Sequence, residues 1–234
     1  MALPKIQQPL FELKLPSTGK KVKFRPFTVR EEKILLIAQE SSDIDQVILS
    51  IKQIVNNCVE GVNVDQIAMF DLEYLLINLR ARSVSNEIEF KIKDPETEET
   101  IELSLDINDV EIKKNKDHTN VIKITNDVSM TMAYPKIDQI RMLKDATEEN
   151  KNDILFKMMV SCIDSVVDGE EVMRLKDFSE EEVDEFIDSL STKHIGDIKK
   201  FFDTMPTLRY EKEYVREDGV KKKFVAEGTE TFFI

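Results

Sequence analysis

The spacing of the apolar residues changes near residue 86, and this change limits the folds that the chain can adopt. Before it, the run Ile44–Val59 repeats apolar residues at a spacing of about 3.6, which predicts an amphipathic helix. After it, residues 88–92 alternate between apolar and charged side chains, the period of about 2 of a half-buried strand. We therefore expect an α+β fold: a helical body with an inserted antiparallel β module at about 86–133, one face of which lies in solvent.

The segments before this module are predicted to form a β-hairpin and helices. Residues 10–15 and 22–27 alternate around a Pro-Ser-Thr-Gly turn, which predicts the hairpin. Thr28 and Glu31 then form a capping box for a helix at about 29–40. Asp71 is expected to cap a further helix that ends at about residue 84.

Helices are predicted again after the module. The apolar residues from Ile154 to Val166 indicate one long amphipathic helix that ends near Asp168-Gly169. Ser179 starts another helix with a capping box, and a last helix stops at Pro206. We expect four segments: 1–85 (hairpin and helices), 86–133 (the β module), 134–206 (helices packing on the first segment) and 207–234 (a C-terminal hairpin and apolar tail).

The C-terminal segment combines hairpin chemistry with an apolar end. Asp218-Gly219 lies between two runs that carry Tyr, Val and Phe, a pattern typical of a tight hairpin. The chain then closes on Phe232-Phe233-Ile234, although chain ends are ordinarily polar. Candidate partner-binding residues in this segment are Tyr210, Tyr214, Phe224, Phe232, Phe233 and Ile234.

Two interpretations of the tail remain open. If it folds back onto the protein's own core, deleting residues 229–234 destabilises the isolated protein, by roughly 3–5 kcal/mol for each fully buried Phe. If a partner binds it, the truncated protein folds and fails to assemble. We expect Phe232 to anchor to the chain's own core, and the hairpin beside it to meet the partner.

Composition excludes several classes of protein. The chain has a net charge of -13 and a pI of about 4.8, so it lacks the positive surface of a general nucleic-acid binder. No run approaches the 18 or so consecutive apolar residues of a membrane span, and residues 1–8 lack the pattern of a signal peptide. Cys58 and Cys162 lie on the apolar stripes of predicted helices, which favours reduced core thiols but does not exclude a disulfide between them. We expect an acidic, soluble, intracellular protein.

The sequence carries little sign of catalysis. His118 lies in a polar loop and His194 in the first turn of a helix, and no pattern pairs them. The chain contains no CxxC, HExxH or calcium-loop pattern, no GxSxG, and no glycine-rich phosphate loop. The acidic cluster from Glu180 to Glu185 is better explained as the solvated start of a helix. We predict that the protein is not an enzyme and has no cofactor, metal ion or catalytic residue.

Basic residues gather at two places, Lys20–Arg25 in the first hairpin and Lys221–Lys223 in the last. Basic and apolar residues interleave at both, which a single-stranded nucleic acid could exploit. Lysines on the edges of sheets commonly prevent unwanted strand pairing, and we favour that interpretation.

The order of several short segments resembles a known family. The segments are Leu10–Lys20, Phe24–Lys33, Phe70–Leu75, Met132–Pro135, Phe186–Leu190, Phe201–Pro206 and the closing Gly228–Phe233. Together they resemble the baseplate hub subunits of T4-like contractile-tailed phages, over nearly the whole chain. No single segment is a specific motif, and the resemblance rests on their order.

The resemblance implies a viral protein for assembly of the central baseplate hub, acting through contacts with other hub or tail proteins. It implies no reaction and supplies no residue-level binding site. Some members carry cysteine pairs that look like small zinc knuckles. Here Asp94–Thr97 and Glu217–Gly219 stand at the corresponding turns, so metal binding is not carried over.

Alternatives to a hub component are a transient assembly chaperone that is absent from the mature virion, and an acidic mimic of DNA. The lysines mixed among the acidic residues of the β module argue against the mimic. The expected location is the host cytoplasm during assembly, and the tail baseplate if the protein is retained. Neither membrane nor nucleic acid is an expected partner, and the oligomeric state stays open.

Overall fold

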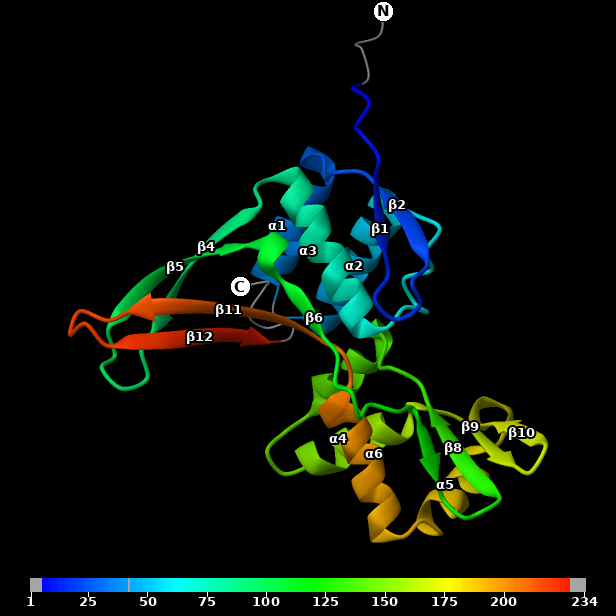
Figure 1. The fold of residues 1–234 in the computed structure, drawn as a ribbon. Helices are drawn as coiled ribbons and strands as arrows, with labels where there is room; N and C mark the ends of the chain where they lie inside the picture. Colours follow the sequence, from blue (N-terminus) through cyan, green and yellow to red (C-terminus); the bar gives the residue numbers. More distant parts are fainter. Residues whose placement is uncertain (1–5, 42, 228–234) are drawn as a thin grey trace, which may run out of the picture. The chain divides into compact units, whose positions relative to one another are not determined.

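The computed structural model describes residues 6–41 and 43–227. It is a mixed α+β structure built from helices and small antiparallel sheets, which confirms the predicted fold class (Figure 1). The chain divides into two compact units. Of the described residues, the first unit contains 6–41, 43–113 and 206–227, and the second contains 114–205.

The first unit begins with the predicted hairpin, in which Phe11 pairs with Phe24. Asp71, which lies 54 residues later in the chain, stabilises its turn. The Asp71 carboxylate accepts a hydrogen bond from the Ser17 N–H (2.9 Å) and another from the Ser17 hydroxyl. Asp71 was predicted to cap a helix, and this was wrong: the helix begins earlier, at Met69, and the buried carboxylate serves the turn instead. The strands of this sheet are β1 (Phe11–Lys14), β2 (Lys21–Phe24) and β3 (Val59–Glu60), in the order β1-β2-β3.

The predicted capping box of Thr28 and Glu31 is present, and its glutamate also binds Arg25. The Thr28 N–H donates to Glu31 (2.9 Å), and Arg25 forms an ion pair with the same carboxylate (3.1 Å). Burial favours a higher pKa for Glu31, but the hydrogen bonds from Arg25 and Thr28 outweigh it and lower the pKa to about 2. The helices of this unit are α1 (Val29–Glu40), α2 (Ile44–Cys58) and α3 (Met69–Ser83).

The core of the first unit lies on α2 and α3. The period of about 3.6 in α2 places Ile48, Ile54 and Val55 on one buried face, as predicted. In α3 the buried face is wider, because side chains from Phe70 to Leu79 are covered almost without interruption.

Two hairpins complete the first unit. The first joins β4 (Glu87–Lys93) to β5 (Thr100–Asp106), and a 3₁₀ turn η1 (Ile107–Asp109) follows it. The second joins β11 (Thr207–Val215) to β12 (Lys221–Glu227), and β6 (Glu111–Lys113) adds to the other edge of β11. We call the sheet β12-β11-β6 the C-terminal sheet.

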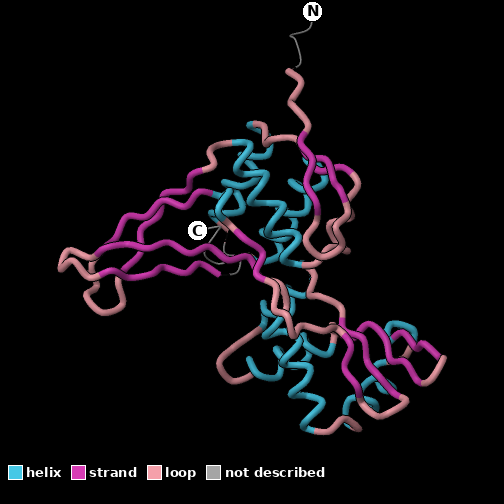
Figure 2. The backbone as a smooth tube through the Cα atoms, in the orientation of Figure 1, coloured by secondary structure: helices cyan, strands magenta, loops and turns pink. Residues whose placement is uncertain are grey.

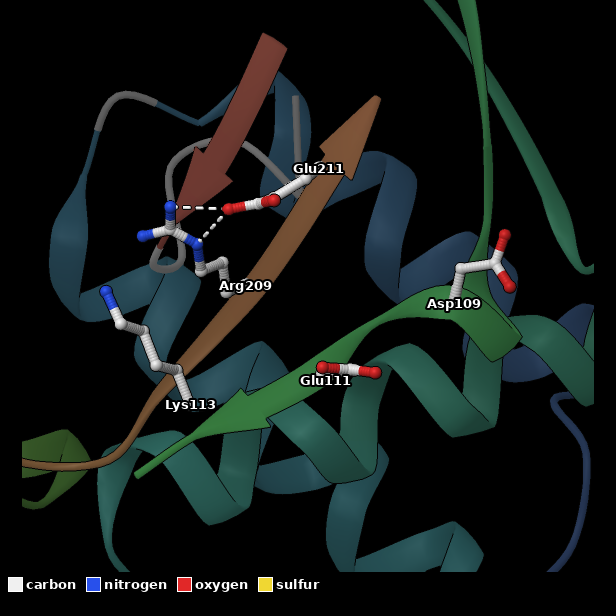
Figure 3. Close-up of a pocket in the computed structure, with 5 residues that line it drawn as sticks. All are labelled: Asp109, Glu111, Lys113, Arg209 and Glu211. Carbon is white, nitrogen blue, oxygen red and sulfur yellow. Dashed lines mark hydrogen bonds and ion pairs between the residues drawn. The ribbon is translucent and has the colours of Figure 1, made fainter. Parts of the chain in front are cut away.

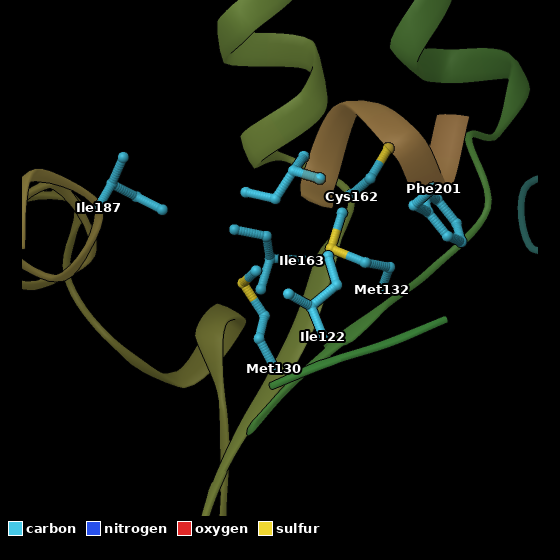
Figure 4. Close-up of a cluster of buried hydrophobic side chains, with 8 residues drawn as sticks. Ile122, Met130, Met132, Cys162, Ile163, Ile187 and Phe201 are labelled. Carbon is cyan, nitrogen blue, oxygen red and sulfur yellow. The ribbon is translucent and has the colours of Figure 1, made fainter. Parts of the chain in front are cut away.

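The second unit is a four-stranded antiparallel sheet, in the order β10-β9-β8-β7, packed against helices. Figure 4 shows Ile122, Met130, Met132 and Ile163 of the sheet in one cluster with Phe201 of the last helix. The strands are β7 (Val121–Lys123), β8 (Val128–Met132), β9 (Ile163–Asp168) and β10 (Glu171–Arg174). The helices are η2 (Ile137–Asp145), α4 (Lys151–Val160), η3 (Leu175–Asp177), α5 (Glu180–Asp188) and α6 (Thr192–Thr204).

The long helix predicted from Ile154 to Val166 is wrong. Helix α4 ends at Val160, and Ile163 to Asp168 form strand β9. The β-branched residues of this stretch favour a strand, and Gly169 (φ +58°) permits the tight turn into β10. The pairing of β8 with β9 shifts register between Thr131 and Met132, which places the apolar residues Ile163 and Val166 three apart, a spacing that also fits a helix.

The boundaries of the units differ from the four expected segments. Strands β4, β5 and β6 lie in the first unit, whereas β7 and β8 lie in the second, so residues 86–133 are divided between the two. The packing of the helices within 134–206 on the first segment stays a prediction.

Both cysteines are free and buried, and they belong to different units. Cys58 is the last residue of α2, as its position on an apolar stripe predicted. Cys162 lies between α4 and β9 rather than on a helix, because α4 is shorter than expected. Burial raises the pKa of each thiol to about 11, so both stay protonated at neutral pH.

Candidate protein-binding surface

The C-terminal hairpin has the tight turn that Asp218-Gly219 predicted. The Arg216 N–H donates to the Val220 carbonyl (3.0 Å), the Val220 N–H donates to Asp218 (3.0 Å), and Gly219 has a φ of +82°. Strands β11 and β12 then pair without interruption from Val215 opposite Lys221 to Arg209 opposite Glu227. Because side chains alternate along a strand, the hairpin has two distinct faces.

The inner face carries the tyrosines that sequence reasoning assigned to a partner. Tyr210 is only 2% exposed, and its hydroxyl donates to the Ser104 carbonyl (3.1 Å). Tyr214 is also buried, and its hydroxyl donates to Asp94 (2.7 Å). These tyrosines hold the hairpin against the β4–β5 hairpin, so neither is exposed to a partner in this structure.

The other four candidate residues have separate outcomes. Phe224 lies opposite Lys212 on the inner face and is half-buried, so part of its ring stays accessible. Phe232, Phe233 and Ile234 lie outside the described residues.

A polar cluster joins the tips of the two hairpins, which run alongside one another in Figure 2. Asp94 is 1% exposed and accepts from Tyr214 and from the backbone N–H groups of Glu96 and Thr97 (2.9 and 3.2 Å). Arg216 donates to Glu96 (2.8 Å), and Lys222 pairs with the same carboxylate (2.5 Å). We call these residues the Asp94 clasp.

The charge state of the clasp follows from these contacts. The Tyr214 hydroxyl and the two backbone donors hold the pKa of Asp94 at about 2, although desolvation opposes them. The neighbouring carboxylates raise the pKa of Arg216, with Asp218 contributing most. Asp94 and Arg216 are therefore both charged at neutral pH, and the Tyr214 hydroxyl keeps the proton that it donates to Asp94. An aspartate before a proline, such as Asp94, typically accepts hydrogen bonds from the backbone of its own turn. No feature of the sequence indicated Tyr214 as a further partner.

The outer face of the C-terminal sheet is exposed and mixed in charge. Glutamates alternate with lysines and arginine across its three strands, and two valines lie among them, Val215 at 59% and Val225 at 40% exposure. The outer face consists of Glu111, Lys113, Arg209, Glu211, Glu213, Val215, Lys221, Lys223 and Val225.

A hollow of about 460 Å³ lies at one end of this face (Figure 3). Its lining is entirely charged: Arg209 pairs with Glu211 (2.7 Å), and Asp109, Glu111 and Lys113 complete it. Small-molecule sites are mostly apolar, so this hollow does not fit the usual pocket for an organic ligand. Charged side chains on an open sheet fit a protein contact better.

No candidate metal site emerges from the part of the chain that the structure describes. Within residues 6–41 and 43–227, no three His, Cys, Asp or Glu side chains are grouped to hold a metal ion. In the same residues, no helix is long and apolar enough to cross a membrane. His194 belongs to the capping box of α6, where it accepts from the Ser191 N–H (3.2 Å).

His118 lies in the loop between β6 and β7, as predicted, but its side chain packs into the second unit. Its ring packs against Tyr134 and Phe201, with centroids 5.6 and 5.2 Å away. The Thr204 hydroxyl donates to Lys200, so it accepts the His118 Nδ1–H (3.0 Å), and His118 Nε2 accepts from the Tyr134 hydroxyl (2.9 Å). Burial lowers the pKa of His118 and favours this neutral form.

Acidification is therefore expected to destabilise the second unit through His118. Since the folded pKa lies below the unfolded value, stability is highest above pH 6.5 and falls as the pH drops below it. Urea unfolding from pH 7.5 to 5 measures this, with His118→Gln as the matched variant that keeps hydrogen-bonding capacity but does not titrate. Equal pH dependence in the two proteins would contradict the assignment.

The family comparison decides what kind of protein carries this surface. The sequence model of the family described as T4 bacteriophage base plate protein matches residues 8–234. The chain belongs to this family.

Membership confirms the resemblance to T4-like baseplate proteins over nearly the whole chain. No curated protein and no solved structure matched the chain. For this base plate protein, the exposed outer face, rather than the buried tyrosines, is the part of the hairpin accessible to other proteins.

Proposed function

We propose that this base plate protein is a non-enzymatic component of the central baseplate hub, and that it assembles through the outer face of its C-terminal sheet. The observation that carries the proposal is the chemistry of that face. The chain as a whole has a net charge of -13, yet the outer face carries three glutamates against four lysine or arginine side chains, a net charge of +1. Another acidic protein can approach it without the repulsion that the rest of the surface imposes.

The fold supports this role by making the hairpin stiff. The buried tyrosines and the Asp94 clasp fix both hairpins to each other, so little conformational entropy is lost when a partner binds. Exposed Val215 and Val225 supply apolar area among the charges, as in the mixed surface of a non-obligate interface.

The proposal is tested by mixing the purified protein with the other hub proteins of the same phage and looking for a co-migrating complex in size-exclusion chromatography. A complex is expected for the native protein, and Glu213→Lys with Val215→Asp should weaken it by at least about tenfold. The matched control is Glu180→Lys with Val172→Asp, which makes the same changes at exposed positions of the second unit.

Either of two results would contradict the proposal: no complex with any hub protein, or equal weakening by the two double variants. Mass spectrometry of mature virions separates a retained component from a transient chaperone, because a chaperone is missing from the finished particle.

A further inference from the structure

Strand β12 has one edge that no other strand of the described residues covers. It is the outermost strand of the C-terminal sheet, and within the described residues it pairs only with β11. All of its residues from Lys221 to Glu227 are in register with β11, so the pairing contains no bulge over that length. An edge of this kind is a template for one further strand.

The hairpin register shows which backbone groups point outward. Arg216 and Val220 form a hydrogen-bonded pair at the turn, and such pairs recur at every second position of an antiparallel ladder. Lys222, Phe224 and Ala226 are therefore bonded to β11. The N–H and C=O groups of Lys221, Lys223 and Val225 face away from the sheet and are free to bond an added strand.

The side chains beside this edge select the strand that can add. Lys221 and Lys223 project from the outer face, while Phe224 is half-buried on the inner face. Lys221 has no ion-pair partner among the described residues, and Lys223 has only an exposed pair with Glu211, which is weak in water. Lysines on an edge repel basic or lysine-rich strands, but they attract an acidic one.

We propose that the edge of β12 binds an extended acidic segment of a partner protein by strand addition. The bound segment places carboxylates beside Lys221 and Lys223 and an apolar side chain beside Phe224. Backbone hydrogen bonds supply affinity, and the alternating side chains supply specificity. This inference rests on the proposed function, since it names the kind of segment that another baseplate protein would offer. A second copy of the chain is a poorer match, because it would bring a second lysine cluster to the same edge.

The test uses a blocked peptide of alternating glutamate and valine, equal in length to the seven residues of β12, and a counterpart with lysine in place of glutamate. Binding to the full-length protein is followed by NMR through the hydrogen exchange of the Lys221 and Lys223 amides. Val225→Pro removes an outward N–H without touching the bonds to β11, and Val225→Thr is its matched control. The acidic peptide should protect both amides, and the Pro variant should bind about tenfold more weakly than the Thr variant.

Three results would overturn the inference: no protection by millimolar acidic peptide, equal binding of the lysine peptide, or equal binding by the two Val225 variants. A protein dimer that disappears in Val225→Pro would instead identify a second copy as the occupant. Unchanged thermal unfolding of both variants confirms that the hairpin is intact. The peptide assay contains no other baseplate protein, so its failure and a missing hub complex remain distinguishable.

Discussion

Replacing Tyr210 by alanine is expected to lower the free energy of unfolding of the first unit by about 3–5 kcal/mol. The side chain is 2% exposed, and it lies between Ala226 of the neighbouring strand and the β4–β5 hairpin. Its removal leaves a cavity of ring size and an unsatisfied Ser104 carbonyl at the point where the two hairpins meet. Urea unfolding followed by circular dichroism measures the change.

Tyr210→Phe is the matched control for this prediction. It keeps the ring and removes only the hydrogen bond to Ser104, so a loss of about 1 kcal/mol is expected. If the alanine and phenylalanine variants lost equal stability, the ring would not be part of the packing between the hairpins. The alanine variant should also fail in the hub-binding assay, because its outer face is no longer held in place.

Phe201→Ala is expected to lower the free energy of unfolding of the second unit by about 3–5 kcal/mol. Phe201 is 2% exposed and lies in the buried cluster of the sheet, where it also contacts the rings of His118 and Tyr134. Loss of this ring leaves a cavity in the cluster and removes the surface against which His118 packs. The Thr204–His118–Tyr134 hydrogen bonds should loosen with it.

The effect of Phe201→Ala is measured by urea unfolding, with hydrogen exchange of peptides from residues 114–205 as the local readout. Phe201→Leu is the control, because a side chain of more similar volume should cost less than about 2 kcal/mol. If protection within the second unit were unchanged in the alanine variant, Phe201 would not be a core residue.

Much of the fold could be predicted from local patterns. Helix α2, the terminal hairpins and the capping boxes at Thr28 and Ser179 follow from apolar period, turn residues and cap residues, which act over only a few positions. The failure at Ile163 has the same origin. The register shift between β8 and β9 spaces Ile163 and Val166 three residues apart, which fits a helix, and only the pairing with β8 identifies the segment as a strand.

The candidate surface was only half predictable. Alternation along β11 required Tyr210 and Tyr214 to share one face, but it could not decide whether that face is buried. That face is buried because the two tyrosines bind Ser104 and Asp94, which lie more than a hundred residues earlier in the chain. The role of His118 was hidden for a similar reason, because its partners Tyr134 and Thr204 lie 16 and 86 residues away along the chain.

Residue types at short spacing, and their order along the chain, were enough to predict the α+β class, the hairpins, the lack of recognisable catalytic motifs and the baseplate family. The folded protein was needed to show which face of the C-terminal hairpin meets solvent, how the chain divides into units, and that Asp71 and Asp94 each bind a turn. Burial and long-range hydrogen bonds depend on which segments pack together, and no local pattern specifies that packing.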